Sequence, residues 1–182
     1  MAHVFVSYVR QNRDEVDRLA AELKHNGVPV WLDRNDIEPG ARWRDAIKGA
    51  IQTGSFFMAC FSREYQERDR THMNEELTLA IDELRARPSD KTCFIPVLIN
   101  QTEIPSRRIS ASEDLSDIQA VNLYENWTYG IHRIIAVLKY DDPLYVRAMR
   151  LVEIVERGSN TDRLYAIREL QGMGTAAKPA LF

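Results

Sequence analysis

Two adjacent carboxylates, Glu75 and Glu76, stand at the start of a predicted helix and are the side chains best placed to do chemistry. The helix is predicted from one apolar stripe, formed by Met73, Leu77, Ala80, Ile81 and Leu84. At about 100° per residue, Glu76 lies roughly 80° from the middle of this stripe and Glu75 points almost directly away from it. We therefore expect Glu75 in solvent and Glu76 at the edge of the buried face. The alternative is that Glu76 only offsets the helix dipole.

The helix follows a stretch that reads as the central strand of a sheet. Residues 56–61 are a continuous apolar run, typical of a strand buried on both faces in a parallel sheet, and the run ends at Ser62. Residues 63–71 form a polar, highly charged connection between this strand and the helix. A carboxylate one turn into the next helix can reach a cleft at the carboxyl end of this strand.

The first 140 residues alternate between strand patterns and helix patterns. This alternation predicts an α/β fold with right-handed crossovers, in which a five-stranded parallel sheet has helices on both faces. We expect the flavodoxin-like strand order 2-1-3-4-5. The predicted strands are 4–6, 28–32, 56–61, 93–99 and 120–123, and the predicted helices are 13–25, 43–51, 73–84 and 127–138.

This strand order has a topological switch point between the first and third strands, and ligands bind outside the carboxyl ends of the strands there. The expected crevice is formed by residues from four parts of the chain. The residues that line the expected crevice are Tyr8, Arg10, Ser62 and Glu76, and Asp33 and the loop to Gly40 lie beside them.

Composition and missing motifs exclude several classes of function. The formal net charge of −3 and the absence of a long basic run argue against nucleic acid as a partner. No G-x-G-x-x-G follows the first strand and no P-loop occurs, so hydride transfer and P-loop chemistry are not expected. No signal peptide or membrane-length apolar stretch is seen, and Cys60 and Cys93 lack metal-ligand spacing, so we expect a cytoplasmic protein with buried thiols and no metal site.

Three motifs in order resemble those of the Toll/interleukin-1 receptor (TIR) domain over about residues 3–139. The first is Val4 to Tyr8, the second runs from Trp31 to Gly40, and the third is Phe61-Ser62 followed by Glu76-Leu77 and Ala80. The overall pattern is most similar to bacterial members of the family. The resemblance implies NAD⁺ as a substrate rather than a bound cofactor, cleaved at its nicotinamide–ribose bond.

The resemblance also implies roles for particular residues. The family's catalytic glutamate corresponds to Glu76, and contacts with the nucleotide are implied for Tyr8, Arg10, Asp33, Glu38, Gly40, Trp43 and Ser62. Enzymatic members often carry a tryptophan four residues before this glutamate, and His72 stands there instead, either stacking on a ring or lying on the surface. Such members are activated by self-association and act in immune or cell-death signalling. The product could be ADP-ribose, its cyclic form or a base-exchange product.

Two other functions remain open at this point. A non-catalytic TIR adaptor would dock through the loop from Asp33 to Trp43 onto other TIR domains, and a related enzyme would cleave a different nucleotide. Beyond the predicted TIR domain at 1–140, residues 141–182 form a helical segment that resembles the start of a HEAT-like repeat. Such a segment could bind a further partner or a trigger, or it could simply pack against the first domain.

Overall fold

The computed structural model describes residues 3–32, 45, 48–49, 56–68, 71–86, 94–174 and 177. These residues fall into two compact units, Met1–Ile131 and His132–Phe182. The boundary lies inside α6 (Trp127–Leu138), a little before the predicted one at residue 140. Within the described part of the chain, no helix is long and apolar enough to cross a membrane.

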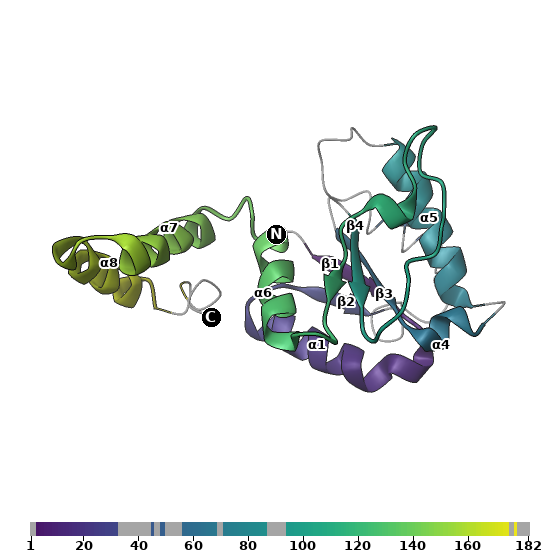
Figure 1. Ribbon diagram of the computed structural model, residues 1–182, viewed down its shortest axis with the longest axis horizontal. Helices are drawn as coiled ribbons and strands as arrows, with labels where there is room; N and C mark the ends of the chain where they lie inside the picture. Colours follow the sequence, from purple (N-terminus) through teal and green to yellow (C-terminus); the bar gives the residue numbers. More distant parts are fainter. Residues whose placement is uncertain are drawn as a thin grey trace. The chain divides into compact units, whose positions relative to one another are not determined.

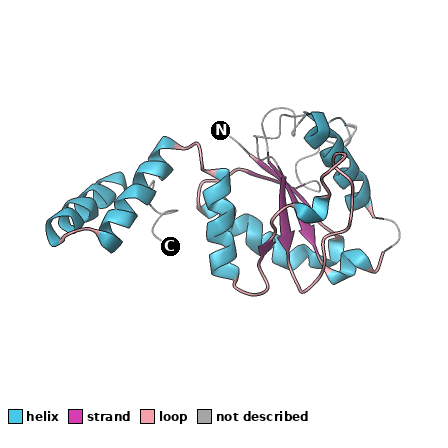
Figure 2. Ribbon diagram, turned by 45° about the horizontal axis from the view of Figure 1, so that its top comes forward, coloured by secondary structure: helices cyan, strands magenta, loops and turns pink. Residues whose placement is uncertain are grey.

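The first unit is built on a parallel sheet of five strands. They are β1 (Val4–Ser7), β2 (Val30–Leu32), β3 (Phe56–Phe61), β4 (Phe94–Leu98) and β5 (Val121–Asn122). The order β2-β1-β3-β4-β5 confirms the predicted topology, and the strand arrows run in the same direction (Figure 2). The register pairs Ser7 with Ala59 and Phe57 with Phe94, so β1, β3 and β4 are neighbours and their carboxyl ends lie at one edge.

Helices follow the strands as the alternation predicts (Figure 1). A short 3₁₀ helix, η1 (Arg10–Asn12), leads into α1 (Arg13–His25), whose buried residues Val16, Leu19, Ala20 and Leu23 are the predicted ones. Gly27 takes a positive φ of 74° directly after α1, as expected of the glycine that ends a helix. Among its described residues, this unit also contains α4 (Arg63–Gln66), α5 (His72–Ala86), η2 (Leu115–Asp117) and the first residues of α6. The predicted helix at 43–51 lies largely outside the described residues.

One face of the sheet packs against α5 through a core of aromatic residues. Phe57 stacks between Phe5 and Phe94, with ring centroids 5.5 and 5.6 Å away. Met73, Leu77, Ala80 and Ile81 cover these rings from α5, which confirms the predicted stripe. The core therefore fixes the rotation of α5 about its own axis, and with it the direction of every other side chain on that helix.

Pro96 lies in β4, paired in register with Ala59 of β3. A proline has no N–H for the ladder, so its tolerance depends on which side its nitrogen faces. The Leu98 carbonyl accepts from Leu123, whereas the Ile99 N–H donates to Phe61. Because the backbone groups of successive strand residues point to alternate sides, the Pro96 nitrogen points to the same side as the Leu98 carbonyl, away from β3. The paired register with β5 begins only at Val97, so no bond of the ladder is lost.

The second unit contains the end of α6 and a hairpin of two helices, α7 (Pro143–Arg157) and α8 (Asn160–Met173). These two helices confirm the helical segment predicted for this part of the chain. Asp142 and Ser159 cap the two helices by accepting backbone N–H groups. Arg147 of α7 is ion-paired with Glu169 of α8. The hairpin buries Tyr145, Ala148, Leu151, Ala166 and Leu170 and leaves an apolar groove of about 440 Å³ between its helices. The predicted HEAT-like character of this segment stays a prediction.

Candidate active site

Glu76 lies on the buried side of α5, and its carboxylate accepts a hydrogen bond from the Ser7 hydroxyl. Only 3% of Glu76 is exposed, whereas its neighbour Glu75 is exposed. The difference predicted from helical phase is therefore confirmed, and Glu76 is buried more deeply than the expected edge position. A buried carboxylate needs partners, and Ser7 at the end of β1 supplies one.

The side of β1 that carries Ser7 follows from the alternation of strand side chains. Phe5, two residues earlier, belongs to the core under α5, and so does Val9, two residues later. Ser7 therefore faces the same helix, and its register partner Ala59 is small enough to leave room for the carboxylate. Sequence reasoning noted Ser7 only as a strand end. The period of two from Phe5 was the signal that could have placed it beside Glu76.

The other predicted contacts on the first loop and on α5 lie at the same edge of the sheet. Tyr8 is half-buried and directly follows β1, while Arg10 is exposed in the first position of η1. His72 is exposed as the first residue of α5. Each of these residues is within five positions of Ser7 or Glu76 in the sequence. Their predicted contacts with a nucleotide remain predictions.

Four predicted site residues lie outside the described part of the chain. They are Asp33, Glu38, Gly40 and Trp43, which belong to the loop after β2 and to the predicted helix that follows it. Cys93 also lies outside it. Cys60 is buried in β3, and burial raises the pKa of its thiol to about 12, so it is the unreactive thiol that was expected.

Ser62 has a structural role that the sequence analysis did not assign to it. Its hydroxyl accepts the backbone N–H of Tyr65 at 3.2 Å and so caps α4, and the residue is fully buried. The charged connection over 63–71 therefore contains a short helix at residues 63–66, which the sequence analysis did not predict. A four-residue helix is too short to produce a visible apolar period. Ser62 followed by the acidic Glu64 in the first turn was the available signal.

A polar cluster that sequence reasoning missed joins the segments following β1, β3 and β4. Glu64 Oε2 accepts the Asn12 side-chain amide at 3.3 Å and the Asn100 side-chain amide at 2.9 Å. Asn100 in turn accepts the backbone N–H of Arg63 at 2.9 Å. These bonds hold the pKa of Glu64 at about 2, below its ordinary value of 4.5, with the Asn100 amide as the largest cause. Glu64 therefore remains an anion at physiological pH.

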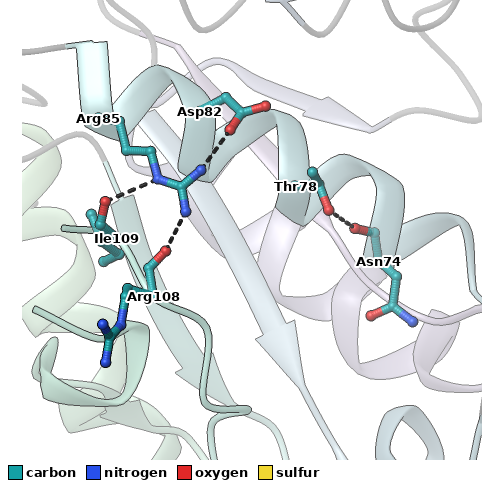
Figure 3. A network of polar contacts seen from close by, with 6 residues as sticks. All are labelled: Asn74, Thr78, Asp82, Arg85, Arg108 and Ile109. Carbon is teal, nitrogen blue, oxygen red and sulfur yellow. Dashed lines mark hydrogen bonds and ion pairs between the residues drawn. The ribbon is translucent and has the colours of Figure 1, made fainter. Parts of the chain in front are cut away.

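The N-terminus of α5, which carries Glu76, is fixed by its own contacts. Thr71 caps the helix by accepting the backbone N–H of Asn74 at 3.1 Å. The Tyr65 hydroxyl donates to the Asn74 side chain at 2.6 Å, which ties α5 to α4. Thr78, one turn later, donates to the Asn74 carbonyl (Figure 3). The position of Glu76 thus depends on capping and on side-chain contacts as well as on the core.

The C-terminal half of α5 is held by Arg85. Its guanidinium donates to the backbone carbonyls of Ile109 and Arg108 and is ion-paired with Asp82 (Figure 3). The planar guanidinium can satisfy several acceptors at once, which a lysine ammonium cannot do in the same geometry. Arg85 therefore fastens the 100–120 segment to the outer face of α5. Among the residues that the structure describes, no group of three His, Cys, Asp or Glu side chains could hold a metal ion.

The fold and this arrangement define a flavodoxin-like α/β domain with a buried carboxylate at the switch point of its sheet. The family model for the TIR domain matches residues 4–135, which is more than half of the chain. The chain therefore belongs to the TIR domain family. This result confirms the resemblance noted in the sequence, although not its bacterial, NAD-cleaving subtype.

Two solved structures with TM-scores above 0.5 share the fold at low identity. The TIR domain of the Toll-related receptor TRR-2 from Hydra magnipapillata is 16% identical, with a TM-score of 0.54, and covers 74% of this chain and 95% of its own. A metazoan TIR-STING receptor from C. gigas is 17% identical, with a TM-score of 0.54, over 94% of this chain and 54% of its own. A prokaryotic SEFIR domain is 18% identical, with a TM-score of 0.48, over 76% of this chain and 99% of its own. No relative was found among curated proteins.

Proposed function

We propose that this TIR domain cleaves NAD⁺ at the nicotinamide–ribose bond, with Glu76 as its catalytic carboxylate. One observation carries the proposal. Glu76 is a buried acid, bonded by Ser7, at the edge of a parallel sheet where domains of this topology bind their ligands. A surface glutamate serving only the helix dipole would not need this burial or a partner on a strand 69 residues away.

The chemistry requires a single carboxylate. As the bond between C1′ and the ring nitrogen breaks, its electron pair leaves with nicotinamide, which becomes neutral and needs no general acid. Positive charge develops on the ribose, and the fixed Glu76 carboxylate stabilises it, as carboxylates do in glycoside hydrolysis. Water then adds to C1′ and releases a proton, giving ADP-ribose. Attack by an adenine nitrogen instead gives the cyclic product, and attack by another pyridine base gives exchange.

The flanking residues suit the rest of the substrate. Tyr8, half-buried beside Ser7, can stack on a ring, and the exposed Arg10 can bond the diphosphate. His72, Ser62 and the residues of the loop after β2 complete the proposed set of substrate contacts, although Ser62 already caps α4. In this proposal the enzyme acts in the cytoplasm in immune or cell-death signalling, is activated by self-association and receives its trigger through the C-terminal helices.

The test is nicotinamide release by the purified chain at high protein concentration, where self-association is favoured. Glu76→Gln keeps the shape of the side chain and removes its charge, so release should fall at least about a hundredfold. Glu75→Gln is the matched control, adjacent in sequence and exposed, and should keep most activity. Loss of release in the Glu75 variant with retention in the Glu76 variant would contradict the assignment.

A second candidate, a non-catalytic module that assembles with other TIR domains, is favoured by the same burial. With 3% of its surface exposed and a bond to Ser7, Glu76 could be a purely structural acid. Two of the similar structures are described as receptors, in keeping with such a role. This candidate predicts assembly without consumption of NAD⁺, and assembly unaffected by Glu76→Gln in a variant that still folds.

A further inference from the structure

The segment from Ser7 to Asn12 is held by a carboxylate at each end. At its start, Ser7 donates to Glu76, and at its end Asn12 donates to Glu64. Tyr8 and Arg10 lie between these two anchors. The two carboxylates come from different helices, α5 and α4, so the segment spans the gap between them.

The second anchor is built to stay in place. Asn12 is 3% exposed, and its backbone N–H donates to the Val9 carbonyl at 2.9 Å, which closes the turn that carries Arg10. Glu64 is in turn held by Asn100 from the segment after β4, and Asn100 accepts the N–H of Arg63. The result is a chain of hydrogen bonds that links the segments following three neighbouring strands.

We infer that Glu64 is a positioning residue, which fixes the Tyr8 to Arg10 turn beside Glu76 so that this turn can bind the substrate. This inference rests on the proposed cleavage of NAD⁺ and adds a second carboxylate to it with a different role. Glu64 does not act on the reacting bond. It sets the place of the residues that bind the rest of the nucleotide, and so it affects binding rather than the chemical step.

The orientation of the Asn12 amide supports this role. Its Nδ2 points at Glu64, and its buried Oδ1 has no hydrogen-bond partner among the described residues. A buried amide oxygen without a donor is costly, and the charged bond on the other side of the same amide offsets that cost. Glu64 therefore adds a charged bond to the core contacts of Val9 that already hold the turn, and removal of that charge should loosen the turn.

The experiment compares Glu64→Gln with Glu67→Gln, an exposed acid three residues further along the chain. For Glu64→Gln we expect KM for NAD⁺ to rise about tenfold with kcat within about twofold of wild type, and no change for Glu67→Gln. The effect should be partial, because the Gln11 side chain can also bond Arg68 and retain part of the link between η1 and the end of α4. A purely structural role would instead lower the melting temperature and leave KM unchanged, which would overturn the inference.

A double variant tests the pairing directly. Asn12→Asp alone places a second carboxylate next to that of Glu64. The two negative charges repel each other, so KM should rise at least as much as in Glu64→Gln. Combining Asn12→Asp with Glu64→Gln restores an amide–carboxylate bond with the roles exchanged, and should return KM to within about threefold of wild type. A double variant no better than the worse single variant would contradict the pairing.

Hydrogen exchange separates this inference from the proposed activity. The backbone amides of residues 8–12 should exchange at least about tenfold faster in Glu64→Gln than in wild type or Glu67→Gln, whether or not NAD⁺ is cleaved. If wild type releases no nicotinamide, the proposed function fails, and unchanged exchange in Glu64→Gln then overturns the inference as well. Faster exchange in that case supports the role of Glu64 in holding the Tyr8 to Arg10 turn, even though the proposed activity fails.

Discussion

Ser7 and Glu76 are 69 residues apart in the sequence, and the hydroxyl of the first donates to the carboxylate of the second. Ser7 ends a central strand and Glu76 lies in the second turn of the helix packed on that strand. This bond ties the proposed catalytic group to a strand that is buried along its whole length. A carboxylate held in this way does not reorganise as charge develops on a substrate, which is the condition for strong electrostatic stabilisation.

Ser7→Ala should weaken both stability and turnover. The substitution leaves the buried Glu76 carboxylate with one donor fewer, at a cost of about 1–3 kcal/mol in the free energy of unfolding. Nicotinamide release should fall about tenfold, because the carboxylate is less well oriented. Urea unfolding and a release assay measure the two effects. Ser7→Thr, which keeps the hydroxyl on a strand, is the control and should lie closer to wild type in both.

Gly130→Ala should destabilise the protein although alanine favours helices. A Cβ at Gly130 would lie 2.6 Å from Leu123 Cδ2 and 3.3 Å from Val121 Cγ1, so the Leu123 side chain, which is buried, or α6 itself would have to shift. We expect a loss of about 1–3 kcal/mol in the free energy of unfolding. Gly172→Ala in α8 is the matched control, since nothing lies within 4 Å of its Cβ position. It should be neutral or stabilising by up to about 1 kcal/mol. Destabilisation of equal size at both sites would contradict this reasoning.

Glu64 should make the protein more sensitive to acid. Its pKa is about 2 in the folded state and 4.5 ordinarily, so its contribution to stability is fully present above about pH 4.5. That contribution is lost as the pH falls toward 2, where the folded protein must also take up the proton. Urea midpoints of wild type and Glu64→Gln should therefore differ at pH 6 and converge near pH 2. A constant difference across this range would contradict the assignment of the low pKa to Glu64.

Arg85→Lys should loosen the segment of residues 100–120. The lysine keeps the charge but cannot bond the Ile109 and Arg108 carbonyls and Asp82 together. We expect a loss of about 1 kcal/mol in the free energy of unfolding and faster hydrogen exchange around residue 109. Arg157→Lys is the control, because within the described part of the chain Arg157 is paired with Glu153 of its own helix at an exposed position. An equal change in both variants would show that the backbone carbonyls contribute nothing.

The sequence predicted the elements whose patterns repeat over several residues. The limits of α1 and the buried side of α5 follow from the period of 3.6, and the burial of Glu76 follows from the phase of α5. The limits of β3 follow from its continuous apolar run, and the strand order follows from the alternation of strands and helices. The Glu64 cluster could not be predicted in this way. Asn12, Glu64 and Asn100 lie in three separate connections, and only the side-by-side arrangement of β1, β3 and β4 brings them together.

Ser62 shows a different difficulty. A serine at the end of a parallel strand can contact a ligand or cap the next helix, and both roles use the same hydroxyl in the same place. The choice depends on whether the following residues turn into a helix at once, and four residues carry too weak a pattern to decide it. In this protein Tyr65 donates its N–H to Ser62, so the cap is formed.

Pro96 also affects the backbone hydrogen bonding of β4 on the side that faces away from β3. Among the described strands, the first half of β4 pairs with β3 alone, and its side chains are buried. Because the nitrogen of Pro96 carries no hydrogen, this part of β4 offers one backbone donor fewer to any added strand. The substitution of a donor by proline lies before the pairing with β5 begins, and so it does not disturb the carboxyl end of the sheet where Glu76 lies.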